Sequence, residues 1–314
     1  MSLDIETIID RRRLKRRLSL WRVAALIAVG LAIIALLPNS GFSPMGAHVA
    51  RVTLSGIIVD DRAQQDLLRE IGEDENVQAL ILYIDSPGGT TTGSEALYET
   101  VREVAKVKPV VAVLGTVAAS GGYIAALSAD HIVARGNTIT GSIGVLFQLT
   151  EVTGLMEKIG VDVDFVRSGP LKAEPNMFGT PSAEALRSTQ AMVDASFDWF
   201  VGLVVERRKL EEATARILSD GRVYTGWQAL ENGLIDAIGG EEMARTWLFD
   251  EHNIDADLPT EEWVVDEDSE FGGLASDAAV GFVGLLLSGI SEKTLSAKGL
   301  TLDGLVSVWH PEPQ

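Results

Sequence analysis

Residues 77–89 read VQALILYIDSPGG, an apolar run that ends in a polar turn. Alternate strand residues point to opposite faces, so a run such as ALILYI is apolar on both, which suits a parallel sheet covered by helices. The Pro-Gly pair is strong turn punctuation and ends the strand there. A second run of this kind, PVVAVLG, follows at 109–115. The sequence therefore predicts an α/β domain built on a mostly parallel sheet.

The segments around these two runs continue the same alternation. Amphipathic stretches with apolar residues three and four positions apart predict helices between short apolar strands. We expect one α/β domain over residues 47–250, with further strands at 48–58, 131–135, 143–147 and 161–166, and with helices at 60–72, 93–107 and 182–209.

A basic head and an apolar segment precede this domain. Residues 18–37 read LSLWRVAALIAVGLAIIALL, and 20 residues of helix span roughly 30 Å, the thickness of a bilayer core. The head at 1–17 favours a cytoplasmic N-terminus, and a Pro/Gly/Ser linker follows at 38–46. We therefore expect a single-pass inner-membrane protein with its main domain on the periplasmic side. A cleaved signal peptide is the alternative, and it also exports the domain.

Charge and cysteine content exclude several classes of function. Residues 1–22 hold seven basic and three acidic side chains, which leaves 19 basic and 42 acidic ones on the remainder. Such an acidic domain repels phosphate backbones, so no nucleic-acid partner is expected. The absence of cysteine excludes thiol nucleophiles and cysteine metal sites. The C-terminal extension at 251–314 is acidic and then apolar, and we expect an interface or packing helix at 272–290.

Three glycine-containing junctions follow predicted strands: DSPGG at 85–89, AASGGY at 118–123 and TGSIGV at 140–145. Ligands of open parallel sheets bind at the carboxyl ends of strands. Ser120 would open a helix there, where unpaired amides and the helix dipole stabilise a developing oxyanion. The competing interpretation is an ordinary N-cap serine beside glycines that pack closely. Similarly, DSPGG is either a simple turn or the source of an amide that faces a substrate carbonyl.

A serine nucleophile needs a general base. Two of the four histidines lie in predicted strands and two in the polar tail, so none suggests a Ser/His pair; they are His48, His131, His252 and His310. Lysine is the known substitute, although a lysine base at neutral pH must lose roughly three pKa units, about 4 kcal/mol. Lys172, in SGPLK at 168–172, is the candidate. A solvated loop lysine is the alternative.

The ordered set DSPGG, AASGGY, TGSIGV and SGPLK resembles the signal peptide peptidase A family in its short single-domain form. The likeness covers about residues 48–245 and includes the N-terminal anchor. By position, Ser120 matches the family's nucleophile, Lys172 its general base and Ser142 the hydroxyl that positions this lysine. Gly88 and the N–H of Gly121 match the oxyanion hole. The loop at 173–181, AEPNMFGTP, departs from the pattern that we expect around the substrate pocket.

The resemblance also implies a fold, partners and an activity. The fold would be that of the Clp protease and crotonase, a spiral of ββα units, in a homo-oligomeric ring whose dyad forms between adjacent subunits. Substrates would be peptides such as spent signal peptides at the membrane, and no metal or organic cofactor is implied. Three alternatives stay open: a related membrane protease that acts on a stomatin-like partner, a crotonase-like acyl-CoA enzyme, and a non-catalytic membrane scaffold of the same fold.

Overall fold

The computed structural model describes Trp21, residues 46–265 and residues 306–308. The chain divides into two units, 1–46 and 47–314, and the account below concerns the second. The predicted membrane helix at 18–37 lies outside the described residues except for Trp21, and so does the predicted helix at 272–290. Over the part of the chain that is described, we find no helix with the length and apolar character that a bilayer crossing requires.

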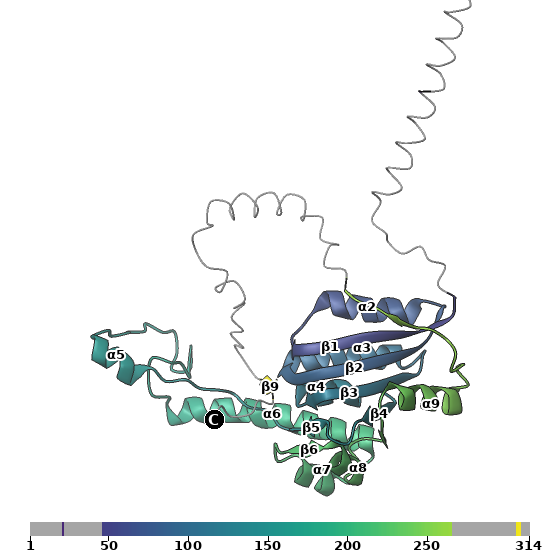
Figure 1. The fold of residues 1–314 in the computed structure, drawn as a ribbon. Coiled ribbons are helices and arrows are strands. Elements are labelled where there is room, and N and C mark those ends of the chain that lie inside the picture. Colours follow the sequence, from purple (N-terminus) through teal and green to yellow (C-terminus); the bar gives the residue numbers. More distant parts are fainter. Residues whose placement is uncertain (1–20, 22–45, 266–305, 309–314) are drawn as a thin grey trace, which may run out of the picture. The chain divides into compact units, whose positions relative to one another are not determined.

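The second unit is built on one mixed sheet (Figure 1). Its main path runs in the order β6 (Val223–Thr225), β5 (Ile139–Gly141), β3 (Val110–Ala119), β2 (Val77–Thr90), β1 (His48–Ile58) and β8 (Thr260–Glu262). Off this path, β4 (His131–Ala134) pairs with β3, β7 (Ala237–Ile238) with β4, and β9 (Val306–Val308) with β2. The β5–β6 and β2–β9 pairs are antiparallel, and the other pairs are parallel. The sequence predicted this parallel centre correctly.

The apolar runs of the central strands are buried on both faces of the sheet. In β2, Leu80, Leu82 and Ile84 belong to one hydrophobic core, whereas Ala79 and Ile81 belong to another on the opposite face. Full burial of each Leu or Ile side chain contributes about 1.5–3 kcal/mol. This burial on both faces is the reason that the run at 77–84 lacks the polar alternation of a half-exposed strand.

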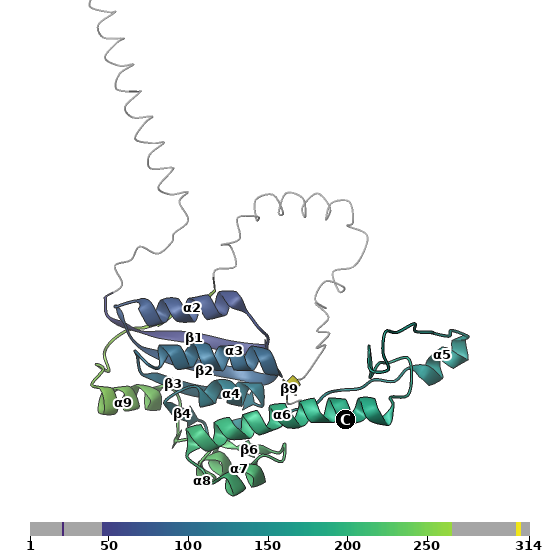
Figure 2. The ribbon, with the colours of Figure 1, turned by 180° about the vertical axis from the view of Figure 1, so that it is seen from behind.

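Helices cover the two faces unequally. The larger core takes side chains from α2 (Arg62–Glu73), α3 (Thr91–Val104), α4 (Gly121–Leu127), α6 (Ala183–Arg208) and α7 (Glu212–Leu218), and also Ala229 of α8. Figure 2 shows α3 and α4 in front of the strands. The smaller core is closed by α9 (Glu241–His252). The remaining helices are α5 (Thr153–Ile159) and α8 (Gly226–Glu231). Ser182 caps α6 by accepting a hydrogen bond from the Ala185 amide, which agrees with the predicted start of this helix at residue 182.

Two predicted strands and one predicted boundary differ from the structure. Residues 161–166 form no strand, and 143–147 contain only an isolated bridge, so both strand predictions were wrong. The residues at 161–166 are exposed, and none of the strands in the described part of the chain pairs with their Val/Asp alternation. The folded body also continues past the predicted boundary at residue 250, because α9 ends at His252 and β8 pairs with β1.

Candidate active site

Ser120 lies at the junction between β3 and α4. It is 1% exposed and has φ 56° and ψ −117°, a conformation that a non-glycine residue adopts only under constraint. Its N–H donates to the Gly141 carbonyl at 2.8 Å, and its own carbonyl accepts from the amides of Tyr123 and Ile124 at 2.9 and 3.0 Å. These bonds fix Ser120 at the start of a helix, as expected, and its strained backbone is typical of functional sites.

Two glycines bring the start of α4 against the DSPGG loop. A Cβ atom on Gly121 would lie 2.4 Å from Ser94 Oγ and 2.9 Å from the Gly89 nitrogen, and one on Gly122 would lie 2.7 Å from the Ser86 carbonyl oxygen. Only glycine fits at either position, because real Cβ contacts are never this short. The glycines of ASGGY therefore serve the close packing of the Ser120 turn against residues 86–89.

The DSPGG loop is ordered by hydrogen bonds of its own. Gly88, at φ 110°, donates its N–H to Ser86 Oγ at 3.1 Å, and this hydroxyl donates to the Gly56 carbonyl at 2.6 Å. Gly89 follows, and a Cβ there would lie 1.8 Å from the Ile58 carbonyl oxygen. The Gly88 amide, which the sequence suggested for the oxyanion hole, is thus engaged inside the loop. Ser86 and Gly89 also shape this loop; both lie in the DSPGG motif, but neither was among the predicted site residues.

Ser142 lies beside Ser120 on the neighbouring strand end. Ala119 of β3 pairs with Gly141 of β5, so the two serines each follow directly after a paired residue. Ser142 is also mostly buried, has a positive φ of 49°, and donates its N–H to the Arg222 carbonyl at 2.8 Å. Three of the sequence motifs therefore meet at one place, at the carboxyl ends of β2, β3 and β5.

Tyr123 anchors the first turn of the helix behind Ser120. Its ring is fully buried, and its hydroxyl donates to the Leu234 carbonyl at 2.7 Å. Burial raises the pKa of Tyr123, so the hydroxyl stays neutral at physiological pH. The AASGGY motif thus places its tyrosine in the core, where its hydrogen bond to Leu234 holds α4 in position.

Lys172 lies in a different environment from the three motifs. It belongs to the segment 145–181, which we call the arm and which contains α5; both ribbon views draw α5 beyond the end of α6, away from the sheet (Figures 1 and 2). Lys172 is exposed, and its N–H closes a turn onto the Gly169 carbonyl at 3.2 Å. A single chain therefore does not bring this amine to the buried Ser120.

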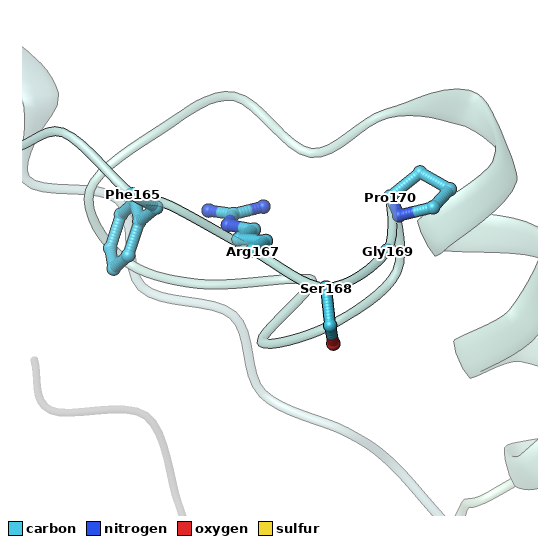
Figure 3. Close-up of a pocket in the computed structure, with 5 residues that line it drawn as sticks. All are labelled: Phe165, Arg167, Ser168, Gly169 and Pro170. Atoms are coloured by element: carbon cyan, nitrogen blue, oxygen red, sulfur yellow. The ribbon is translucent and has the colours of Figure 1, made fainter.

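The loop that carries Lys172 is organised around Arg167. The Arg167 guanidinium lies 4.4 Å from the centre of the Phe165 ring and forms an ion pair with Glu174, which brings the two sides of the loop together. An open pocket of about 550 Å³ lies here, lined by Phe165, Arg167, Ser168, Gly169 and Pro170 (Figure 3). The contacts of Arg167 thus give the loop of the SGPLK motif a defined shape within the single chain.

The arm exposes an unusual amount of apolar side chain. Its exposed large apolar residues are Leu146, Leu149, Leu155, Ile159, Val161, Val163, Phe165, Val166, Leu171, Met177 and Phe178. Scattered apolar residues are normal on a surface, but a continuous segment of them marks an interaction site. The exposed apolar side chains of the arm are therefore typical of an interaction surface.

The two histidines that lie in strands, His48 and His131, are not close to Ser120. His131 pairs with Val111 in the ladder between β4 and β3. Ser120 lies nine residues further along β3, roughly 30 Å away at the rise of a strand. His48 begins β1, and its Nε2 accepts a hydrogen bond from Trp263 Nε1 at 3.2 Å. A constrained serine at a helix start, beside glycine amides, fits the nucleophile of a serine hydrolase.

Comparison with known proteins agrees with this class. The model of peptidase family S49 matches residues 102–255, and the Clp protease model matches residues 51–136. The chain therefore belongs to peptidase family S49 and is a serine peptidase with a Clp-like α/β fold.

Three relatives show how far the likeness extends. A Synechocystis sp. protein named as a protease is 36% identical, over 67% of this chain and 76% of its own length. A protein of Enterococcus faecium named as signal peptide peptidase SppA is 36% identical, over 67% of this chain and 60% of its own. The chloroplastic serine protease SPPA of Arabidopsis thaliana is 34% identical, over 59% of this chain and 27% of its own. The chain thus spans less than two thirds of the last two relatives.

Proposed function

We propose that this chain is a membrane-anchored serine endopeptidase in which Ser120 is the nucleophile and Lys172 of an adjacent copy is the general base. The observation that carries the proposal is the separation of the two residues: Ser120 is held in the folded body, whereas Lys172 is exposed on an apolar arm. A second copy that covers the arm would exclude water from the amine and would bring it to a neighbouring Ser120. Repetition of this head-to-tail contact closes a ring.

The chemistry is acyl transfer. The neutral amine of Lys172 accepts the proton of Ser120 Oγ while the oxygen attacks the scissile carbonyl carbon, and Ser142 orients the amine. The ammonium then protonates the leaving amine, and water hydrolyses the ester that remains on Ser120. The first step regenerates only the neutral amine of Lys172. In the second step this amine accepts a proton from the attacking water and returns it to Ser120 Oγ as the acyl group leaves as the acid, which restores both residues.

The oxyanion requires two amide donors near Ser120. The first is the Gly121 N–H, at the beginning of α4. For the second we favour Gly89 over Gly88, because the Gly88 N–H already donates to Ser86 Oγ and because the Gly89 nitrogen lies close to Gly121. Gly88 then serves to shape the loop that presents Gly89.

The proposed substrates are residual signal peptides and other short apolar segments. An apolar arm suits apolar peptides, and the apolar segment at 18–37 would hold the site beside the membrane in which such peptides remain. In this arrangement the N-terminus is cytoplasmic and the peptidase domain lies on the periplasmic side of the inner membrane. Action on a stomatin-like partner would keep the same chemistry with another substrate.

Mixing two inactive variants tests whether the site is shared between copies. Ser120→Ala and Lys172→Ala subunits, folded together in equal amounts, should recover about a quarter of the wild-type sites, because half of the subunits supply each intact residue. A mixture of Ser120→Ala with the double variant Ser120→Ala/Lys172→Ala is the matched control and should recover none. Cleavage of a synthetic signal peptide is the readout.

If both residues came from one chain, the two mixtures would be equally inactive although wild type is active. That result would overturn the shared site. Inactivity of wild type on every apolar peptide, together with failure of a fluorophosphonate to label Ser120, would overturn the proposed chemistry itself.

A further inference from the structure

Both ladders of β2 change register beside the DSPGG loop, and the first of them lies toward β1. The register shifts between Ser55 and Ile57, so the intervening Gly56 lies in an irregular stretch. Such irregularities leave backbone groups without ladder partners. Here the Gly56 carbonyl accepts a hydrogen bond of 2.6 Å from Ser86 Oγ, and the same hydroxyl accepts from the Gly88 N–H at 3.1 Å. A fully buried side chain therefore links the loop to β1 where the backbone pairing changes.

The ladder between β2 and β3 changes register at the same place. The shift falls between Ile84 and Ser86, so Asp85 lies between two pairs of this ladder. Asp85 Oδ1 accepts a hydrogen bond from the Val117 N–H of β3 at 3.0 Å. Gly115 leaves room for the carboxylate, because a Cβ there would lie 3.1 Å from Asp85 Cβ and crowd it. Asp85 therefore ties the loop to β3, as Ser86 ties it to β1.

The segment that these two side chains hold is the one that packs against the Ser120 turn. A Cβ on Gly122 would lie 2.7 Å from the Ser86 carbonyl oxygen, and one on Gly121 would lie 2.9 Å from the Gly89 nitrogen. A shift of the loop would therefore move the Gly89 N–H, the proposed second oxyanion donor, relative to Ser120. Such a donor must be held within about 0.5 Å of its productive position, because it acts on charge that develops only in the transition state.

We infer that Asp85 and Ser86 are positioning residues of the oxyanion hole. Each replaces strand pairing by a side-chain hydrogen bond, and together they fix the Gly89 amide beside Ser120. The inference rests on the proposed function of Ser120 and assigns roles to two residues outside the dyad. Both act through the loop rather than on the substrate. Asp85 serves as a hydrogen-bond acceptor, so its oxygen is required and its charge is not.

Three variants and one control separate positioning from a purely structural role. Ser86→Ala removes the hydroxyl, and Asp85→Ala removes the acceptor. Asp85→Asn retains an acceptor oxygen without the charge. Ser128→Ala is the matched control, because Ser128 is equally buried and its hydroxyl donates to the Ala125 carbonyl at 2.5 Å, at the other end of α4.

The kinetic measurement is cleavage of a synthetic signal peptide by the full-length protein. Ser86→Ala and Asp85→Ala should lower kcat by about 10²-fold, the effect of a lost oxyanion donor, with KM within about twofold of wild type. Asp85→Asn and Ser128→Ala should keep kcat within about threefold, although Ser128→Ala shifts the urea midpoint about as far as Ser86→Ala does. Equal losses of kcat in Ser86→Ala and Ser128→Ala, or in Asp85→Asn and Asp85→Ala, would overturn the inference.

A second measurement needs no catalysis. Hydrogen exchange of the full-length protein, followed on a proteolytic peptide that contains residues 84–90, reports how firmly the loop is held. This peptide should exchange about fivefold faster in Ser86→Ala and Asp85→Ala, as the loss of about one hydrogen bond predicts, and at the wild-type rate in Asp85→Asn and Ser128→Ala.

Equal exchange in all five proteins would overturn the inference, even if the peptidase proved active. If wild type cleaved no peptide and did not react with a fluorophosphonate while the exchange differences held, the two side chains would still hold the loop. Only the proposed function would then fail.

Discussion

The body around Ser120 and the arm around Lys172 are built on opposite principles. In the body, Ser120 and Tyr123 are buried, and backbone hydrogen bonds hold the strained turn. In the arm, most side chains are exposed, and the loop is organised by one ion pair between Arg167 and Glu174. The surroundings of Ser120 are therefore complete in a single chain. The loop of Lys172 has a defined shape, but its amine is exposed to solvent. Under the proposed function, assembly of copies would bring the two residues together.

The largest expected effect comes from removing either residue of the proposed dyad. Ser120→Ala and Lys172→Ala should each lower kcat/KM by about 10⁴-fold or more, because each removes a group that acts in the transition state. Peptide cleavage at neutral pH is the measurement. Ser128→Ala, at the other end of α4, and Lys158→Ala, in the arm, are the controls and should retain activity. Full activity of Lys172→Ala would reduce the arm to a structural element.

Aromatic truncation should distinguish the two regions by stability. Phe200→Ala removes a fully buried ring of α6 and should lower the free energy of unfolding by about 3–5 kcal/mol. Phe178→Ala removes a ring of the arm that is 38% exposed and should cost less than about 1 kcal/mol at a dilution that separates the copies. Urea unfolding measures both.

The same Phe178→Ala variant should weaken assembly if the proposed shared site holds, because its ring belongs to the arm that a second copy would then cover. Sedimentation would show a shift toward smaller species, with a parallel loss of activity. An unchanged oligomer would mean that the apolar arm serves a partner other than a second copy.

Glycine replacements give a smaller but sharper contrast. Gly89→Ala places a methyl group 1.8 Å from the Ile58 carbonyl oxygen and should destabilise the body by about 2–3 kcal/mol. Gly169→Ala meets no atom within 4 Å and should stay within about 0.5 kcal/mol of wild type. Equal thermal midpoints for the two variants would show that the loop at 86–89 is looser than its packing indicates.

The smallest effect concerns how the free energy of unfolding of the body falls at acidic pH. Burial alone raises the pKa of Asp236, but the hydrogen bonds and charge of Arg208 outweigh it and hold this pKa below its ordinary value. Arg208 donates to Asp236 at 2.6 and 3.1 Å. A depressed folded-state pKa stabilises the native state above the unfolded value near 3.9, and this contribution is lost as pH falls through the folded pKa.

Asp236→Asn should therefore cost about 1–2 kcal/mol at pH 7 and should flatten the fall of stability below pH 4. Urea titrations from pH 2 to 7 measure this, with exposed Asp250→Asn as the control. An unaltered acid slope would mean that other carboxylates govern acid unfolding.

Local sequence was sufficient where the environment is set by the chain itself. The strand at 48–58 and the helix at 182–209 were predicted nearly to the residue, because their apolar patterns match the cores that they enter. The strand prediction at 161–166 was wrong because an alternating pattern forms a strand only where a neighbouring strand can pair with it, and none of the described strands does so. Gly88 was assigned to the oxyanion hole by its position in the motif, and the motif does not reveal that the Gly88 N–H donates to Ser86 Oγ within its own loop.

What the sequence alone determined is the parallel centre of the sheet and the serine at a helix start, because apolar runs and glycine punctuation act over a few residues. Only the tertiary structure decided that three motifs meet at the strand ends, that Lys172 lies apart from them, and that the C-terminal strand β9 pairs with the end of β2. Such placements depend on strand order and on which surfaces remain uncovered, and these properties belong to the packed whole.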